Sequence, residues 1–179
     1  MNKFLVFCAL TLGAAVAAPA TAHTSPPDLS GTYVIDRSAS DDPARAIEKA
    51  MSSMRRFKRN AVKRRLQDGM KAADTLRITQ RGDSVMLQPS GRRRVTIVAG
   101  EAKSRTGQRG GTAEMEGDWQ GDTFVVRTTS ERFSREVRYS LGSDGSRMRI
   151  AVTMRAERLS QPIGYVLLYR RVEDAAASE

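Results

Sequence analysis

The sequence predicts a mainly β protein: an antiparallel meander that forms a barrel or half-barrel, with one long basic amphipathic helix, or two, inserted after the first strand. Between residues 75 and 172, apolar residues recur at every second position between short turn sequences. This is the pattern of half-buried antiparallel strands. Between residues 44 and 73 they recur at steps of three and four, which is the pattern of a helix with one buried face.

The first 22 residues predict a secretory signal peptide. Lys3 precedes an almost unbroken apolar run over positions 4–18, and Ala20-Thr21-Ala22 is a small-x-small cleavage sequence. The run is too short for a membrane-spanning helix, and no other long apolar stretch follows, so we expect no transmembrane segment. We expect cleavage after Ala22 and a product that is periplasmic or secreted.

The rest of the chain is expected to form one domain. Residues 23–28 predict a flexible leader, and residues 29–172 hold the barrel together with its helical insertion over residues 42–73. Residues 173–179 are small and acidic, which predicts a flexible tail. A chain of this length is sufficient for a substantial hydrophobic core.

Turn sequences and alternating apolar positions predict eight or nine strands. Asp144-Gly145, for example, is a strong hairpin signal between two of them. One face of nearly every strand is apolar, which favours a sheet that curls around a core. The expected strands begin near Ser30, Thr75, Val85, Arg92, Ala113, Phe124, Val137, Met148 and Ile163.

The helical segment begins at Ser40-Asp41-Asp42-Pro43, in which an acidic or hydroxyl cap precedes a proline in the first turn. Its apolar stripe runs from Ile47 to Ala73, and the opposite face is basic. The whole segment over positions 41–74 has ten basic and five acidic residues. Asn60 or Gly69 is the expected point at which one helix would become two. We expect the segment to cover one face of the sheet or to plug one mouth of the barrel.

The composition leaves few side chains for catalysis. The net charge is +10, and the chain has one His and one Cys. Because Cys8 lies in the signal peptide and His23 at the cleavage point, the mature chain excludes a disulfide, a Cys nucleophile, a Ser-His-Asp triad and a Cys/His zinc site. We therefore expect no catalytic site, no metal, no cofactor and no enzymatic activity.

Three carboxylates share one face of an expected strand: Glu114, Glu116 and Asp118. Paired carboxylates perform acid–base chemistry when burial separates their pKa values. Here Met115 and Trp119 occupy the apolar face, so the acids should point at water. We expect solvated cross-strand pairs with arginines of neighbouring strands.

Short motifs at the two ends of the domain carry a family resemblance. Gly31-Thr32-Tyr33 is similar to the Gly-x-Trp signature of lipocalin-like (calycin) barrels, with Tyr in place of Trp. Arg170 or Arg171 is similar to the arginine that packs across that aromatic ring in calycins. The chain also resembles exported bacterial proteins of unknown function that share the Gly-Thr-aromatic strand, the Asp-Asp-Pro helix and the final Tyr-Arg-Arg strand. The resemblance implies a small β-barrel in which a ligand cavity is possible.

The residue types at the inward-facing positions indicate that the barrel binds a ligand. Methionine is adaptable, and Met-rich linings suit varied apolar molecules, so we expect a non-enzymatic protein that binds an apolar or amphiphilic small ligand. The alternative is a barrel filled by its own side chains. The expected cavity lining is Met115, Trp119, Phe124, Tyr139, Met148 and Tyr165.

The basic helix supports an alternative function at the cell envelope. Cations that border an apolar stripe suit an anionic lipid surface or a protein partner, although a helix that merely docks on the sheet has the same pattern. Aromatic residues make up 6% of the chain and form no basic-aromatic platform, so nucleic acid is not an expected partner. The expected contacts are Arg55, Arg56, Arg59, Arg64 and Arg65.

Overall fold

The computed structural model describes residues 25–52, 54, 56–106, 111–157, 159 and 161–172. The expected signal peptide, its cleavage site and the tail over residues 173–179 lie outside this part of the chain, so export and processing stay predictions. Within the described part, no helix is long and apolar enough to cross a membrane.

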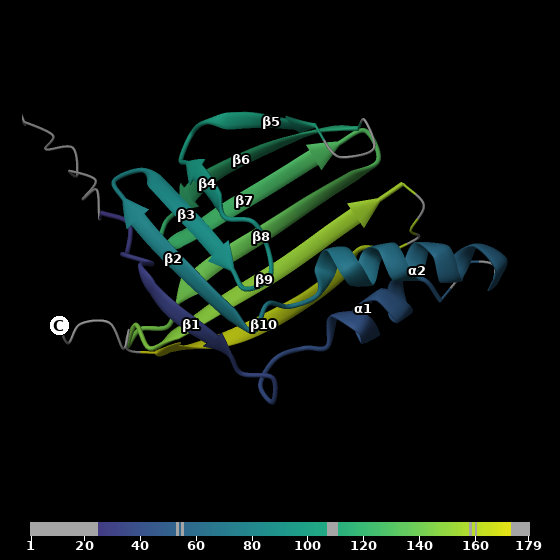
Figure 1. Cartoon of the computed structure of the whole chain (residues 1–179), viewed down its shortest axis with the longest axis horizontal. Coiled ribbons are helices and arrows are strands. Elements are labelled where there is room, and N and C mark those ends of the chain that lie inside the picture. The colour runs from purple at the N-terminus through teal and green to yellow at the C-terminus, as the bar shows by residue number, and fades with distance from the viewer. Residues whose placement is uncertain are drawn as a thin grey trace, which may run out of the picture.

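In the described residues, one antiparallel sheet of ten strands forms the domain, in the order β4-β3-β2-β1-β10-β9-β8-β7-β6-β5 (Figure 1). Each strand pairs with the next along the chain except β4 and β5, which form the two edges, and β1 also pairs with β10. The predicted antiparallel meander in a half-barrel is confirmed. The strands are β1 (Gly31–Ile35), β2 (Thr75–Arg81), β3 (Ser84–Pro89), β4 (Val95–Val98), β5 (Ala102–Thr106), β6 (Thr112–Gln120), β7 (Thr123–Ser130), β8 (Phe133–Leu141), β9 (Arg147–Ala156) and β10 (Ile163–Val172).

The expected count of eight or nine strands is wrong, and the missed strand is β5. Among the described strands, β5 pairs only with β6, and its residues Ala102, Lys103 and Ser104 are all exposed. An edge strand without a buried face needs no apolar alternation, so its sequence carries no strand signal. The expected start of a strand at Arg92 is also wrong, because β4 begins at Val95 and Arg92 lies in the preceding turn.

The sheet curls until β4 meets β6, which narrows the gap between its two edges (Figure 1). Ala99, directly after β4, bridges to Gly117 of β6, and the amide of Gly100 donates to the Gly117 carbonyl at 2.9 Å. A Cβ at Gly117 would lie 2.9 Å from Cζ of Phe124 and closer still to Cγ2 of Ile97. Glycine is therefore the residue that allows this close approach.

The concave face of the sheet holds the core, as the alternation predicts. On β9 and β10 the inward-facing residues are buried and their neighbours are half-buried or exposed. At one end of the core, the Tyr33 hydroxyl donates to the Leu29 carbonyl at 2.9 Å, and Arg171 lies over the Tyr33 ring, 5.5 Å from its centroid. The expected contact between the signature aromatic and a late arginine is thus confirmed, with Arg171 as the arginine.

The helical insertion consists of two helices, α1 (Pro43–Ala50) and α2 (Arg56–Met70). Asp42 caps α1 by accepting from the Ala44 amide at 2.8 Å. The expected break at Asn60 or Gly69 is wrong, because both residues lie inside α2. Instead, the Arg59 guanidinium donates to the carbonyls of Met51 and Ser52. This contact satisfies the C-terminal end of α1 and stabilises the turn that separates the helices.

β1 is much shorter than β10, so the segment between β1 and α1 pairs with the part of β10 that β1 does not reach. The Asp36 amide donates to the Leu168 carbonyl and the Asp41 amide donates to the Val166 carbonyl, both at 2.8 Å. Side-chain oxygens of Ser40 and Asp41 accept from the Leu168 and Val166 amides in return. This pairing places α1 against β10 and brings both helices to one end of the half-barrel (Figure 1).

Candidate ligand-binding cavity

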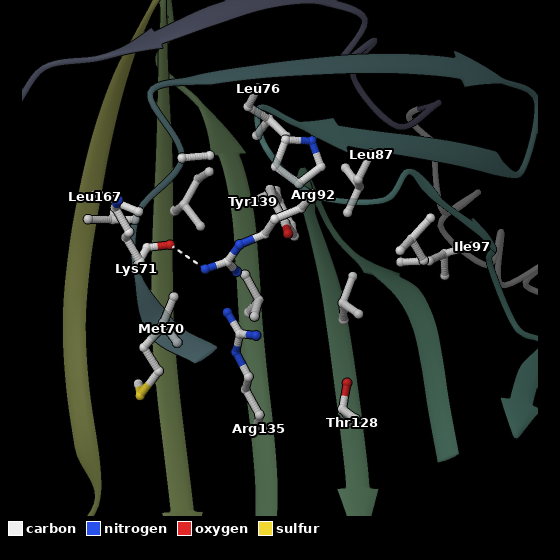
Figure 2. A pocket seen from close by; sticks show the side chains of 18 of the residues that line it. Met70, Lys71, Leu76, Leu87, Arg92, Ile97, Thr128, Arg135, Tyr139 and Leu167 are labelled. Atoms are coloured by element: carbon white, nitrogen blue, oxygen red, sulfur yellow. Dashed lines mark hydrogen bonds between the residues drawn. The ribbon is translucent and has the colours of Figure 1, made fainter. Parts of the chain in front are cut away.

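A cavity of about 360 Å³ lies inside the curled sheet. Its volume is at the lower end of the roughly 300–1,000 Å³ typical of small-molecule sites. Strands β2, β3 and β4 form one wall, β6 to β10 form the other, and the chain after α2 closes part of one end (Figure 2). The lining residues are Met70, Lys71, Ala72, Ala73, Leu76, Leu87, Pro89, Arg92, Arg93, Val95, Ile97, Ala113, Met115, Val126, Thr128, Arg135, Val137, Tyr139, Ile150, Val152, Tyr165, Leu167 and Tyr169.

Strand register explains why the middle of the cavity is apolar. Val126 pairs with Val137, Val137 with Val152, and Val152 with Tyr165, so one inward-facing row of the sheet is almost entirely branched aliphatic. The next row joins Tyr139, Ile150 and Leu167 in the same way. β-branched side chains suit this pleated, half-buried surface.

The two ends of the half-barrel differ. The mouth, as we define it, is the end with the Glu131-Arg132 turn and the last residue of α2, Met70. The packed end carries the turns over residues 121–122 and 142–146. Phe124 and Met148, which lie on strands next to these turns, are completely buried.

The C-terminal end of α2 is fastened to the mouth. The Arg92 guanidinium donates to the Lys71 carbonyl at 2.7 Å (Figure 2). It also donates to the carbonyls of Gly69 and Asp68, both at 3.3 Å. Two tyrosines on the concave face of the sheet add hydrogen bonds. The Tyr165 hydroxyl donates to the Met70 carbonyl at 3.4 Å, and the Tyr169 hydroxyl donates to the Ala73 carbonyl at 2.8 Å. A cation is favourable at a helix C-terminus, so Arg92 caps α2 while it lines the cavity.

Burial keeps the cavity tyrosines neutral over the physiological pH range. It raises the pKa of Tyr139 and that of Tyr169 to about 12. Burial also raises the pKa of Tyr165, and the nearby Arg135 and Arg92 guanidinium groups oppose that rise because a cation stabilises the phenolate. The hydroxyls therefore act as neutral hydrogen-bonding groups in an otherwise apolar lining.

The six predicted lining residues fall into two groups. Met115, Tyr139 and Tyr165 line the cavity. Phe124 and Met148 are buried at the packed end, and Trp119 packs against Phe124 with the rings tilted by 52° and their centroids 5.1 Å apart. Contact of any of the six with a ligand stays a prediction.

Sequence reasoning missed Arg135 and Arg92 as cavity residues. Arg135 lies two residues before Val137 and four before Tyr139 on β8, so strand alternation places it on the same inward face. Arg92 carried no such signal, because its position depends on the turn between β3 and β4 and on the end of α2. Tertiary contacts alone place it at the mouth.

Of the five arginines predicted to contact a membrane, the structure describes the side chains of two, Arg59 and Arg64. Arg55 lies outside the described residues, and so do the side chains of Arg56 and Arg65. Arg64 is exposed, whereas Arg59 already donates to carbonyls at the end of α1.

The carboxylates of β6 behave as expected. Glu114, Glu116 and Asp118 are exposed, and Glu116 lies 3.8 Å from Arg127 of β7. Arg127 in turn pairs with Glu136 of β8 at 3.0 Å. The predicted cross-strand pairing with an arginine on the outer face of the sheet is therefore confirmed for Glu116, and for Glu114 and Asp118 it stays a prediction.

A curled ten-stranded antiparallel sheet with an internal cavity and the Tyr33–Arg171 contact defines a lipocalin-like fold. Solved structures share it. The REP1-NXSQ fatty acid transporter has a TM-score of 0.54 and 13% identity, over 82% of this chain and 97% of that chain. A secretary abundant heat soluble (SAHS) protein from Ramazzottius varieornatus has a TM-score of 0.55 and 9% identity, over 80% and 94%. Human cRBP IV has a TM-score of 0.50 and 19% identity, over 82% and 100%.

No protein family model and no curated protein sequence matches the chain. At the identities above, the likeness to solved structures is one of fold. What this cavity binds has to be argued from its own residues.

Proposed function

We propose that this protein is a non-enzymatic carrier that holds a small ligand with an apolar chain inside the half-barrel. The observation that carries the proposal is the cavity itself, whose central rows are aliphatic and aromatic and whose volume suits a small molecule. Burial of an apolar chain there is favourable by about 25 cal/mol per Å² removed from water. Among the neighbours in fold, one is a fatty acid transporter by name, which agrees with this reading.

A neutral fluorescent probe tests the proposal without assuming a headgroup. We expect N-phenyl-1-naphthylamine to bind the purified protein saturably with a blue-shifted, enhanced emission. The Ala113→Trp variant should abolish this signal, since Ala113 lines the cavity and an indole there fills it. The control is Ala151→Trp, whose site is on the outer face of β9 between the buried Ile150 and Val152. Absence of saturable binding, or equal loss in both variants, would contradict the proposal.

We also propose that the carrier works in the periplasm or outside the cell. The support is the signal-peptide pattern with its cleavage sequence ending at Ala22. The intact mass of the protein from a fractionated host checks this: a periplasmic or secreted product should begin at His23. An uncleaved chain in the cytosol would contradict it.

A second candidate function is contact with an anionic envelope lipid through α1 and α2. The observation that favours it is that Arg45, Lys49 and Arg64 are exposed on the two helices next to the mouth. Co-sedimentation with phosphatidylglycerol vesicles, against phosphatidylcholine vesicles and against a variant with these three residues changed to Gln, tests it. Negligible binding to both vesicles would reject this candidate and leave the carrier proposal standing.

A further inference from the structure

The cavity carries a positive charge that its own lining does not balance. The described lining residues include four cations, Lys71, Arg92, Arg93 and Arg135, and no Asp or Glu. Arg135 is the most enclosed of the four, since the others are exposed and Arg135 is half-buried. Its Nε is shielded from solvent and has no hydrogen-bond partner. The described protein groups therefore leave part of the Arg135 guanidinium unsatisfied, which costs free energy.

We propose that Arg135 and Arg92 form an anion site at the mouth, and that the ligand is an amphiphile with one anionic headgroup, such as a carboxylate or a sulfate, whose tail extends toward the packed end. The inference rests on the proposed carrier function, because it names the ligand class for the same cavity.

The two arginines approach the site from opposite walls. Arg135 projects from β8, where it is paired with Thr128 of β7, and Arg92 comes from the turn between β3 and β4. Figure 2 shows both guanidinium groups extending into the cavity, and both are near enough to Tyr165 on β10 to oppose the rise in the pKa of its hydroxyl. Two like charges in one cavity favour an anion between them.

Arg92 is held in place by contacts that leave it able to bind. Its bonds to the Gly69, Asp68 and Lys71 carbonyls use three N–H donors of the five that a guanidinium has. These bonds fix the group over the mouth, so a headgroup finds a preorganised donor and loses less entropy on binding. Planar guanidinium groups also match the two oxygens of a carboxylate or sulfate.

The direction of the tail follows from what lies along the strands. Four residues separate Arg135 from Tyr139 on β8, which is about 13 Å of strand. Along that length the lining includes Val126, Val137, Val152 and Ile150, and Phe124, which pairs with Tyr139, is completely buried. Arg135 lies near the Glu131-Arg132 turn, and Arg92 bonds to the carbonyl of Lys71 just after α2, so this orientation places the charge on the arginines and the chain on the aliphatic rows.

Ligands with one chain and different headgroups test the charge preference. In calorimetric titrations of the wild-type protein, dodecanoate and dodecyl sulfate below their micellar concentrations should bind about 10- to 100-fold more tightly than 1-dodecanol, the range expected for charge-assisted hydrogen bonds to a partly buried arginine. Equal affinities for the anions and the alcohol would overturn the inference.

Variants of single arginines locate the site. Arg135→Gln should bring the affinity for dodecanoate close to that for 1-dodecanol, with a much smaller effect on the affinity for the alcohol, and Arg92→Gln should act in the same direction. The control is Arg149→Gln, because Arg149 is exposed on the outer face of β9. If Arg135→Gln lowers the affinities for the acid and the alcohol equally, or if Arg149→Gln has the same effect, the inference is overturned. The wild-type headgroup comparison decides the matter even if a cavity variant fails to fold.

The single tryptophan of the chain reports the orientation. Trp119 packs against Phe124 at the packed end, so a bromine on the last carbon of the tail, in 12-bromododecanoate, should quench the fluorescence of Trp119. A bromine beside the headgroup, in 2-bromododecanoate, should quench it much less. The reverse order of quenching would overturn the proposed direction.

The outcomes separate this inference from the function on which it rests. If N-phenyl-1-naphthylamine binds in the cavity but the anions have no advantage over the alcohol, the carrier function stands and the anion site is rejected. If neither the probe nor any dodecyl compound binds, the carrier function itself is rejected, and the anion site with it.

Discussion

Closure of the half-barrel at Gly117 leads to a quantitative prediction. An Ala methyl group at this position would lie 2.9 Å from Cζ of Phe124 and closer still to Cγ2 of Ile97, whereas carbon atoms pack best at about 3.5–4.0 Å. Because Gly117 is buried and its carbonyl already accepts from the Gly100 amide, the crowding must be relieved by moving β4 away from β6 or by shifting both side chains.

The expected cost combines two opposing effects. Overpacking a well-filled core typically costs about 1–3 kcal/mol, and replacing a glycine restricts the unfolded chain, which returns about 0.4–1 kcal/mol. We therefore expect Gly117→Ala to lower the free energy of unfolding by about 1–2 kcal/mol. In a protein of this size the Tm should fall by roughly 3–6 °C.

Urea unfolding followed by circular dichroism measures this change, and the chain supplies a matched control. Gly164 lies inside β10, and the atom nearest to an added Cβ is the Val152 carbonyl oxygen at 4.0 Å, so Gly164→Ala should be neutral or slightly stabilising. Ile97→Leu removes the crowding Cγ2 and should recover part of the loss in a double-mutant cycle. Equal stabilities of the two Gly→Ala variants, or additivity of Gly117→Ala with Ile97→Leu, would refute the reasoning.

Three further predictions follow from single contacts. Tyr33→Phe leaves the buried Leu29 carbonyl without its donor and should lower the free energy of unfolding in urea by about 1–2 kcal/mol; an unchanged midpoint would contradict this. Arg92→Ala removes the cap of α2, so amide exchange over Arg56–Met70 should accelerate while exchange in β8 and β9 does not; uniform acceleration would indicate global destabilisation instead. Tyr139 and Tyr169 should ionise near pH 12 in an ultraviolet titration. Since their folded pKa values exceed the usual 10.0, their contribution to stability is complete below pH 10 and is lost as the pH rises toward 12; ionisation of all the tyrosines near pH 10 would contradict the burial argument.

Local patterns predicted those parts of the molecule in which one strand or helix is sufficient to define a buried face. Val137, Tyr139 and Val152 lie where alternation on their own strands places them. The cap at Asp42 is also readable, because a helix start depends on neighbouring residues. The sequence-based predictions were wrong where contacts between residues distant in sequence determine the structure. Arg59 determines where α1 ends, although it is eight residues beyond Met51.

The candidate site shows the same division. Parity on β8 places Arg135 inside the barrel, but only the full lining shows that no acidic residue among those described accompanies it. Arg92 is exposed in a turn, and its role comes from the α2 carbonyls more than 20 residues earlier in the chain.

The sequence alone determined the antiparallel meander, the inward-facing apolar set and the position of the helical insertion, because these depend on periodicities of two and 3.6 residues that are local to each element. Tertiary structure decided how far the sheet curls, where the two helices separate and which charges surround the cavity. Those features depend on contacts such as Gly117 with Ile97 and Arg92 with Lys71, which no local pattern encodes.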